Sequence, residues 1–181
     1  SGDLSDDWLE GSIKVGIGGE YTSADSSQIY GKISGVGERT WSAPPTVVGD
    51  DANSYELEDA YIGWRSGKSI GETENLLDFT FGRTRYHLGH GMLLWDGSAD
   101  GGSRGGYWTG ARQAFDLAAI GRFKPGANTL EAFYLERDNL PESDSDSNLW
   151  GVNYEYAIGE DTTLGATYMK WNSDAPERDG L

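Results

Sequence analysis

Apolar and polar residues alternate along most of this chain with the period of two that is typical of β-strands. In the first such segment, Ile13 and Ile17 fall on one face, and Lys14 and Glu20 fall on the other. No segment has a convincing helical spacing of apolar residues. The alternation predicts eight strands, at residues 13–22, 28–38, 59–65, 77–81, 115–123, 129–137, 150–158 and 163–168.

Alternation also assigns the residues of segments 115–123 and 129–137 to two faces. In segment 115–123, we expect Phe115 to share the apolar face with Leu117, Ala119 and Phe123. Segment 129–137 is less regular, because both of its faces carry apolar residues. There we expect Phe133 and Leu135 on the same face as Glu131, opposite Leu130, Ala132 and Tyr134.

The connections between the predicted strands alternate in length. Residues 23–27, 124–127 and 159–161 make short links, and 66–76 is intermediate. Longer links at 39–54, 86–114 and 139–148 separate them. Such alternation is typical of an up-and-down antiparallel barrel with tight turns at one rim and long loops at the other.

The apolar face has two possible environments. It is the protein interior in a soluble β-sandwich, and it meets lipid in an outer-membrane barrel, whose polar face lines a lumen. Strands of about 9 to 12 residues fit a tilted crossing of the hydrocarbon layer. Aromatic residues such as Tyr21, Trp150 and Tyr168 lie near strand ends, where a girdle at the lipid headgroups needs them. We therefore predict an all-β, antiparallel, up-and-down transmembrane β-barrel in a bacterial outer membrane, in contact with lipid and lipopolysaccharide.

Residues 1–181 form a single domain in this interpretation. The barrel convention places the short turns and both natural termini on the periplasmic side. Here both chain ends fall on the side of the long loops. We therefore expect a barrel that is incomplete at both ends and part of a larger one.

Composition and charge exclude several classes of protein. The 30 acidic and 14 basic residues give a net charge of -16, which argues against nucleic-acid binding. Cysteine is absent, so disulfides, cysteine zinc sites and thiol nucleophiles are excluded. No apolar run approaches the roughly 18 residues of a transmembrane helix.

The longest link, residues 86–114, is apolar and aromatic at its start and rich in glycine later. We expect it to fold back into the lumen. Residues 83–124 carry six bases against three acids, an excess that favours anions in a pore. An equally weighted alternative is that the arginines pair with lumen carboxylates and fill the barrel. The candidate pore-lining residues are Arg65, Arg83, Arg85, Arg112, Arg122, Asp59, Asp78 and Glu131.

The stretch Leu77 to Gly97 contains Phe81-Gly82-Arg83-Thr84-Arg85 followed by a glycine-rich segment with a tryptophan. Together with Ala60-Tyr61-Ile62-Gly63-Trp64, it resembles the alginate-export-type family of outer-membrane porins. The resemblance covers roughly Glu58 to Phe123. It implies a large monomeric barrel with arginine-lined constrictions for anionic or sugar-like solutes, and it places Arg83 and Arg85 at the pore.

Other chemistry has weaker support. His87 and His90 lack a fixed third ligand for a metal, and the acidic loop with Glu142, Asp144 and Asp146 lacks the glycine and final glutamate of a calcium loop. No nucleophile motif such as Gly-x-Ser-x-Gly occurs. We predict a porin for anionic or sugar-like solutes, without enzyme activity, metal or cofactor. The alternatives are a soluble lectin-like sugar-binding module and a structural barrel around a partner protein.

Overall fold

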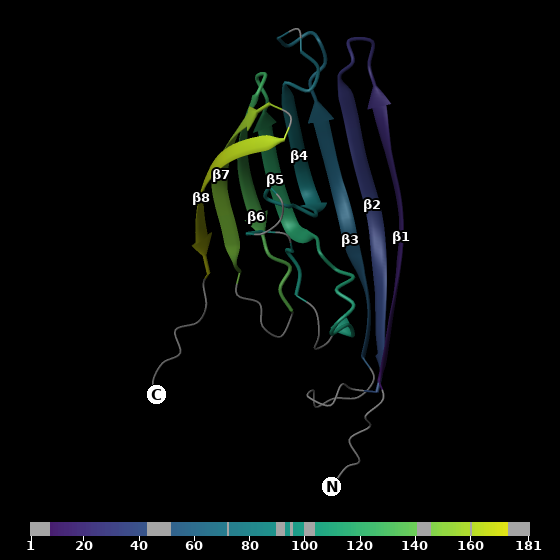
Figure 1. Cartoon of the computed structure of the whole chain (residues 1–181). Coiled ribbons are helices and arrows are strands. Elements are labelled where there is room, and N and C mark those ends of the chain that lie inside the picture. Colours follow the sequence, from purple (N-terminus) through teal and green to yellow (C-terminus); the bar gives the residue numbers. More distant parts are fainter. Residues whose placement is uncertain are drawn as a thin grey trace, which may run out of the picture.

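Eight strands form one antiparallel sheet in the computed structural model (Figure 1), which describes residues 8–42, 52–71, 73–89, 93–94, 96–99, 104–140, 146–159 and 161–173. Each strand pairs with its sequence neighbours, in the order β1 to β8. The tight connections lie at one end of the sheet and the longer ones at the other, as predicted. The strands are β1 (Leu9–Thr22), β2 (Gln28–Trp41), β3 (Ala52–Arg65), β4 (Leu77–Thr84), β5 (Phe115–Phe123), β6 (Asn128–Glu136), β7 (Asn148–Ile158) and β8 (Thr162–Asn172).

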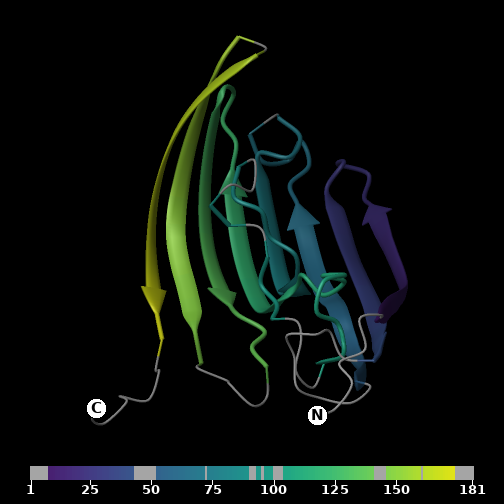
Figure 2. The ribbon, with the colours of Figure 1, turned by 60° about the horizontal axis from the view of Figure 1, so that its bottom comes forward.

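The sheet is strongly curved but not closed (Figure 2). No described strand pairs with the outer edge of β1 or of β8. The all-β, up-and-down part of the prediction is therefore confirmed. No helix among the described residues is long and apolar enough to cross a membrane.

The two faces of the sheet have inverted polarity. The convex face carries exposed apolar side chains on every strand, of which Ile17 is 75% exposed. The concave face carries polar and charged side chains, and many of these are buried, including Asp59, Asp78 and Glu131. Since a water-soluble protein hides its apolar face, this arrangement leaves a continuous apolar surface to be explained.

A small apolar core lies on the concave side of β5, β6 and β7. Phe133 and Leu135 of β6 pack there with Ile120 and with Tyr86 and Leu88, which follow β4. The predicted faces of β6 are therefore confirmed. The first residues of the long β4–β5 connection thus lie against the concave face of the sheet.

Two β-bulges change the faces that simple alternation predicts. Asp59 pairs with Ser34 while Leu57 pairs with Gly35, so Glu58 is an extra residue, and both Glu58 and Asp59 are buried. A second register shift lies between Gly82 and Thr84 of β4, opposite β5. It corrects the prediction for Phe115, which lies in the buried core and not on the exposed apolar face.

Candidate functional site

A row of directly paired polar residues crosses the concave face from β1 to β8. It begins beside the tight turn between β1 and β2 and reaches the middle of β7 and β8. Arginines and carboxylates alternate at its centre, and each residue is the cross-strand partner of the next. The polar row consists of Thr22, Gln28, Arg65, Asp78, Arg122, Glu131, Asn153 and Thr167.

Hydrogen bonds and ion pairs run along the polar row. Arg65 donates from Nε to Asp78 at 3.3 Å and from Nη1 to Gln28 at 3.4 Å. Arg122 donates from Nε to Glu131, and its Nη1 lies 4.0 Å from Asp78. Two guanidinium groups thus face two carboxylates, and the charges at the centre of the row cancel.

Tyr30, the next residue of β2 after Gln28 that points to the concave face, reinforces this arrangement. Its hydroxyl donates to Asp78 at 2.6 Å and lies 2.7 Å from the hydroxyl of Thr80. The guanidinium of Arg65 stacks 4.2 Å from its ring centroid. The ring lies over Gly63, where a Cβ atom would stand 2.1 Å from the Tyr30 Cζ atom. Gly63 is therefore a residue on the polar face that makes room for a neighbouring ring.

Tyr86 links the polar row to the long connection. Its hydroxyl donates to Glu131, and its side chain is buried in the apolar core. Burial, followed by the nearby Glu131 carboxylate, raises the pKa of Tyr86 well above its ordinary value. The hydroxyl therefore stays protonated and remains a hydrogen-bond donor.

A second polar cluster, the Asp138 cluster, lies at the opposite end of the sheet. Asp138 follows β6 and accepts hydrogen bonds from Arg83, Arg104 and Arg112, at 2.7 Å for Arg104 and 2.5 Å for Arg112. Arg83 also pairs with Asp116, and Arg112 Nη1 lies 3.4 Å from Glu56. The Arg112 side chain is 0% exposed. Three guanidinium groups are thus balanced by one buried and two more exposed carboxylates.

Residues 104–113 of the long connection are held against the sheet by carboxylates from two strands. Glu10 of β1 accepts hydrogen bonds from the backbone N–H groups of residues 107, 108 and 109, at 2.8 to 3.0 Å. Glu58 of β3 accepts from the backbone N–H of Gln113 at 3.1 Å and from Lys14 at 2.8 Å. Ser54 donates to the carbonyl of Arg104 at 2.6 Å. The described part of this segment is therefore fixed to the concave face from several sides.

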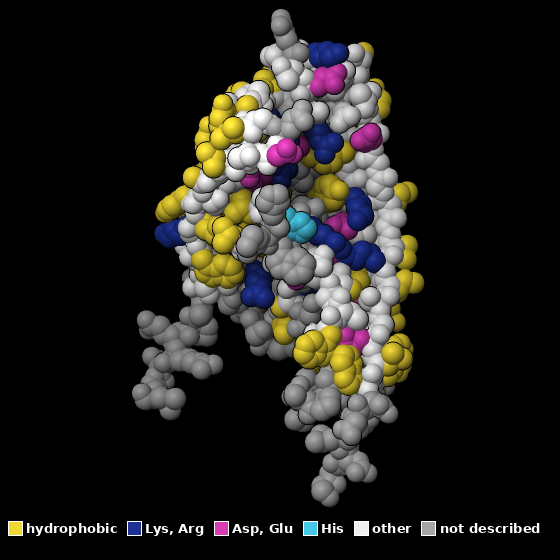
Figure 3. All heavy atoms as spheres, in the orientation of Figure 1, with side chains coloured by type: hydrophobic (Ala, Val, Ile, Leu, Met, Phe, Trp, Pro, Cys, Tyr) yellow, Lys and Arg dark blue, Asp and Glu magenta, His cyan; other side chains and the backbone are white. Residues whose placement is uncertain are grey.

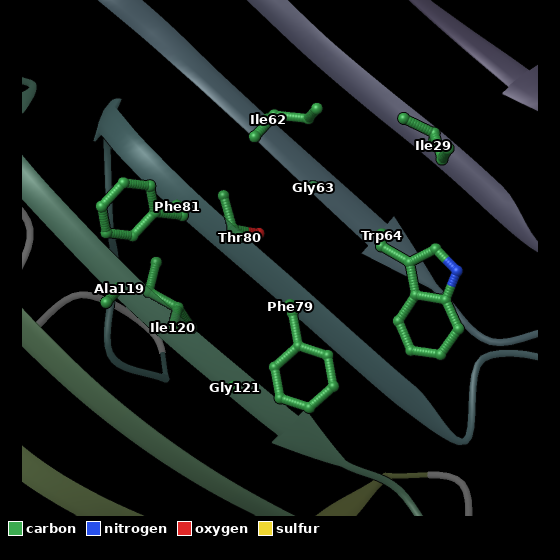
Figure 4. Close-up of a pocket in the computed structure, with 10 residues that line it drawn as sticks. All are labelled: Ile29, Ile62, Gly63, Trp64, Phe79, Thr80, Phe81, Ala119, Ile120 and Gly121. Atoms are coloured by element: carbon green, nitrogen blue, oxygen red, sulfur yellow. The ribbon is translucent and has the colours of Figure 1, made fainter.

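Charged side chains collect at the centre of the concave face, and hydrophobic ones lie along its outer borders (Figure 3). On the convex face, by contrast, side chains from β2 to β5 line an apolar hollow of about 560 Å³ (Figure 4). Trp64 and Phe79 stack at 6.0 Å along it, and the small residues Ala119 and Gly121 open it on the opposite side. The two faces thus offer different chemistry, which is ionic and hydrogen-bonding on the concave face and mainly apolar on the convex face.

No family model, curated protein or solved structure matches this chain. The resemblance to alginate-export porins therefore stays a prediction.

The structure places six of the eight predicted site residues in two clusters and the other two, Asp59 and Arg85, outside them. Arg65, Asp78, Arg122 and Glu131 come together in the polar row, and Asp59 lies deeper, paired with Lys32 at 2.7 Å. Arg83 and Arg112 lie in the Asp138 cluster and are largely buried. Arg85 stands apart, with a side chain that is 43% exposed and 3.7 Å from Glu58.

The prediction did not include the carboxylates that hold the long connection. Glu10 and Glu58 were missed because only the fold shows which backbone N–H groups they face. Asp138 was missed because its three arginines lie 26 to 55 residues away in sequence. The local excess of arginine in residues 83–124 was the one available signal, since buried arginines need carboxylate partners.

The described residues contain no group of three or more histidine, aspartate or glutamate side chains arranged for a metal. Of the weaker metal candidates, His90, Glu142 and Asp144 lie outside the described residues. His87 is exposed on the concave side.

Proposed function

We propose that this chain forms part of the wall of a bacterial outer-membrane channel that passes small anionic or sugar-like solutes. In this proposal the convex face contacts lipid and lipopolysaccharide, and the concave face lines the lumen. The channel works by passage and not by catalysis, and it needs no metal or cofactor. Further strands at the edges of β1 and β8 close a larger monomeric barrel.

The inverted polarity of the sheet is the observation that carries this proposal. Isoleucine, phenylalanine, tryptophan and tyrosine side chains cover the convex face of all eight strands, while ion pairs occupy the concave face. In water, such an apolar surface costs about 25 cal/mol for each Å² exposed. A bilayer removes this cost, and closure satisfies the backbone groups of the edge strands.

Reconstitution of the closed barrel, in which this chain supplies eight strands, into planar bilayers tests the proposal. We expect stepwise conductance and a requirement for detergent during purification. A chain that stays soluble without detergent and does not conduct would contradict the channel and favour a sugar-binding module. A chain that inserts in folded form without conducting would instead favour a structural barrel around a partner.

Arg85 offers a test of ion selectivity. It is the most exposed of the predicted arginines, and a charge in a narrow pore shifts the barrier for an ion by about 1 kcal/mol or more. We expect Arg85→Ser to lower the anion-to-cation permeability ratio, measured from reversal potentials, by about fivefold without loss of folding. An unchanged ratio in a well-folded Arg85→Ser variant would rule out this role.

Arg112 provides the matched control for that experiment. Its side chain is completely buried against Asp138, so it has no access to a passing ion. Arg112→Ser is expected to reduce the amount of folded protein while the channels that do form keep the wild-type permeability ratio.

A further inference from the structure

The concave face holds a polar hollow, which is lined by the first three strands and has a volume of about 330 Å³. Part of its floor is bare backbone, because Gly18 of β1, the cross-strand partner of Lys32, has no side chain, and the paired residues Gly19 and Gly31 contribute only backbone. Tyr30 and Tyr61 stand at its wall, with ring centroids 6.4 Å apart and planes at 69°. We call this site the Gly-Tyr hollow. A bare backbone floor beside an aromatic wall leaves space for a flat, ring-shaped solute.

Tyr30 is held rigidly at this wall. Its hydroxyl is engaged by Asp78 and Thr80, and Arg65 covers one face of its ring. The hydroxyl of Tyr61, in contrast, makes no hydrogen bond to another described residue. The wall therefore combines a preorganised ring with the Tyr61 hydroxyl, which has no partner in the described part of the chain and can donate or accept a hydrogen bond.

Charged groups also border the Gly-Tyr hollow, and most of them are already paired. Lys32 pairs with Asp59 at 2.7 Å, and Arg65 pairs with Asp78 at 3.3 Å. Both cations keep spare N–H donors and partly exposed side chains. Glu20 also lines the hollow and accepts no hydrogen bond from another described residue. Asp59 and Asp78 thus compensate Lys32 and Arg65, and Asp78 also lies near Arg122. Among the residues that line the hollow, the carboxylate of Glu20 is the one charge without a partner in the described part of the chain.

We propose that the Gly-Tyr hollow binds one ring of a neutral sugar. The C–H face of a pyranose packs on the Tyr61 ring, and its hydroxyl groups bond to Glu20, Lys32 and Arg65. Each sugar hydroxyl both donates and accepts, which fits a site with donors and acceptors side by side. A sugar carboxylate is disfavoured here, because it would meet the unpaired charge of Glu20.

The inference rests on the proposed function only in that solute reaches the hollow through the lumen. Binding itself is measurable in micelles of an amine-oxide detergent, which has no sugar headgroup to compete. We expect the full chain to bind methyl glucoside saturably in a calorimetric titration, and to bind glucuronate at least about fivefold more weakly. Absence of saturable glucoside binding, or equal affinity for the two sugars, would overturn the proposal.

Variants assign the binding to this hollow. Tyr61→Ala should weaken glucoside binding by about tenfold or more, whereas Tyr61→Phe keeps the ring and should lose less. Tyr21→Ala removes an exposed tyrosine from the convex face and should leave binding unchanged. Glu20→Gln should raise the affinity for glucuronate toward that for the glucoside. Unaltered binding in a folded Tyr61→Ala variant would show that the sugar binds elsewhere and would contradict this assignment.

The outcomes also separate this inference from the channel itself. A protein that conducts ions but binds no glucoside contradicts the sugar site and leaves the channel intact. A protein that binds glucoside in micelles but never conducts contradicts the channel and leaves the sugar site intact.

Discussion

Asp138→Asn is expected to destabilise the folded protein by about 3 to 5 kcal/mol, because it leaves buried guanidinium groups without their shared counter-charge. Arg83, Arg104 and Arg112 all donate to this one carboxylate, and the Arg104 and Arg112 side chains are almost fully buried. Urea unfolding in micelles, followed by tryptophan fluorescence, measures the loss. The variant should also expose the bonds after Arg104 and Arg112 to trypsin.

Asp116→Asn is the matched control. Asp116 also pairs with Arg83, but its side chain is 58% exposed, so its loss should cost no more than about 1 kcal/mol. Adding Arg104→Gln to Asp138→Asn removes one unbalanced charge and should restore part of the lost stability. If Asp138→Asn proved as stable as Asp116→Asn, the Asp138 cluster would not anchor the long connection.

The Asp138 cluster makes the stability of the folded protein depend on pH. Burial raises the pKa of Asp138, but the guanidinium groups of Arg83, Arg112 and Arg104 outweigh this effect and hold the pKa below its ordinary value. The stabilisation is therefore complete above the pKa of the carboxyl in the unfolded chain, and it disappears as the pH falls through the lower pKa of the folded protein. We expect the difference in stability between wild type and Asp138→Asn to shrink in strong acid.

Strand positions and connection lengths were predictable because they depend on local alternation. The faces of β7, with Trp150 and Val152 outward, follow directly from a period of two. The prediction failed at Phe115 because a bulge inserts one residue and reverses the alternation beyond it. Glu58 was overlooked for the same reason, since alternation places only one of Glu58 and Asp59 on the concave face.

The pairing of charges was only partly predictable. Alternation places Arg65, Asp78, Arg122 and Glu131 on one face, but their alignment into a row depends on the register of four strands. The excess of arginine in residues 83–124 was visible, yet it had two interpretations. In the structure Arg83 and Arg112 form buried pairs with Asp138, which is the pairing interpretation. Arg85 stays 43% exposed beside Glu58, and its role in ion selectivity stays a prediction.

Ile33→Arg is expected to have the largest effect on the convex face. Ile33 is exposed and lies in the interior of β2, away from both ends of that strand. If this face contacts lipid, an arginine near the bilayer midplane costs about 2 to 4 kcal/mol, whereas one near the interface costs about 0 to 1 kcal/mol. Ile158→Arg, at the end of β7, is therefore the matched control for the same change of side chain.

Folding of both variants into phospholipid vesicles, followed by the shift in gel mobility between heated and unheated samples, measures the difference. A membrane-facing surface predicts that Ile33→Arg inserts poorly while Ile158→Arg folds close to wild type. In water, both substitutions would add a solvated charge to an exposed apolar surface, so both would improve solubility and leave folding nearly unchanged. Equal behaviour of the two variants would therefore place the convex face in water or against protein, because neither environment distinguishes the middle of a strand from its end as a bilayer does.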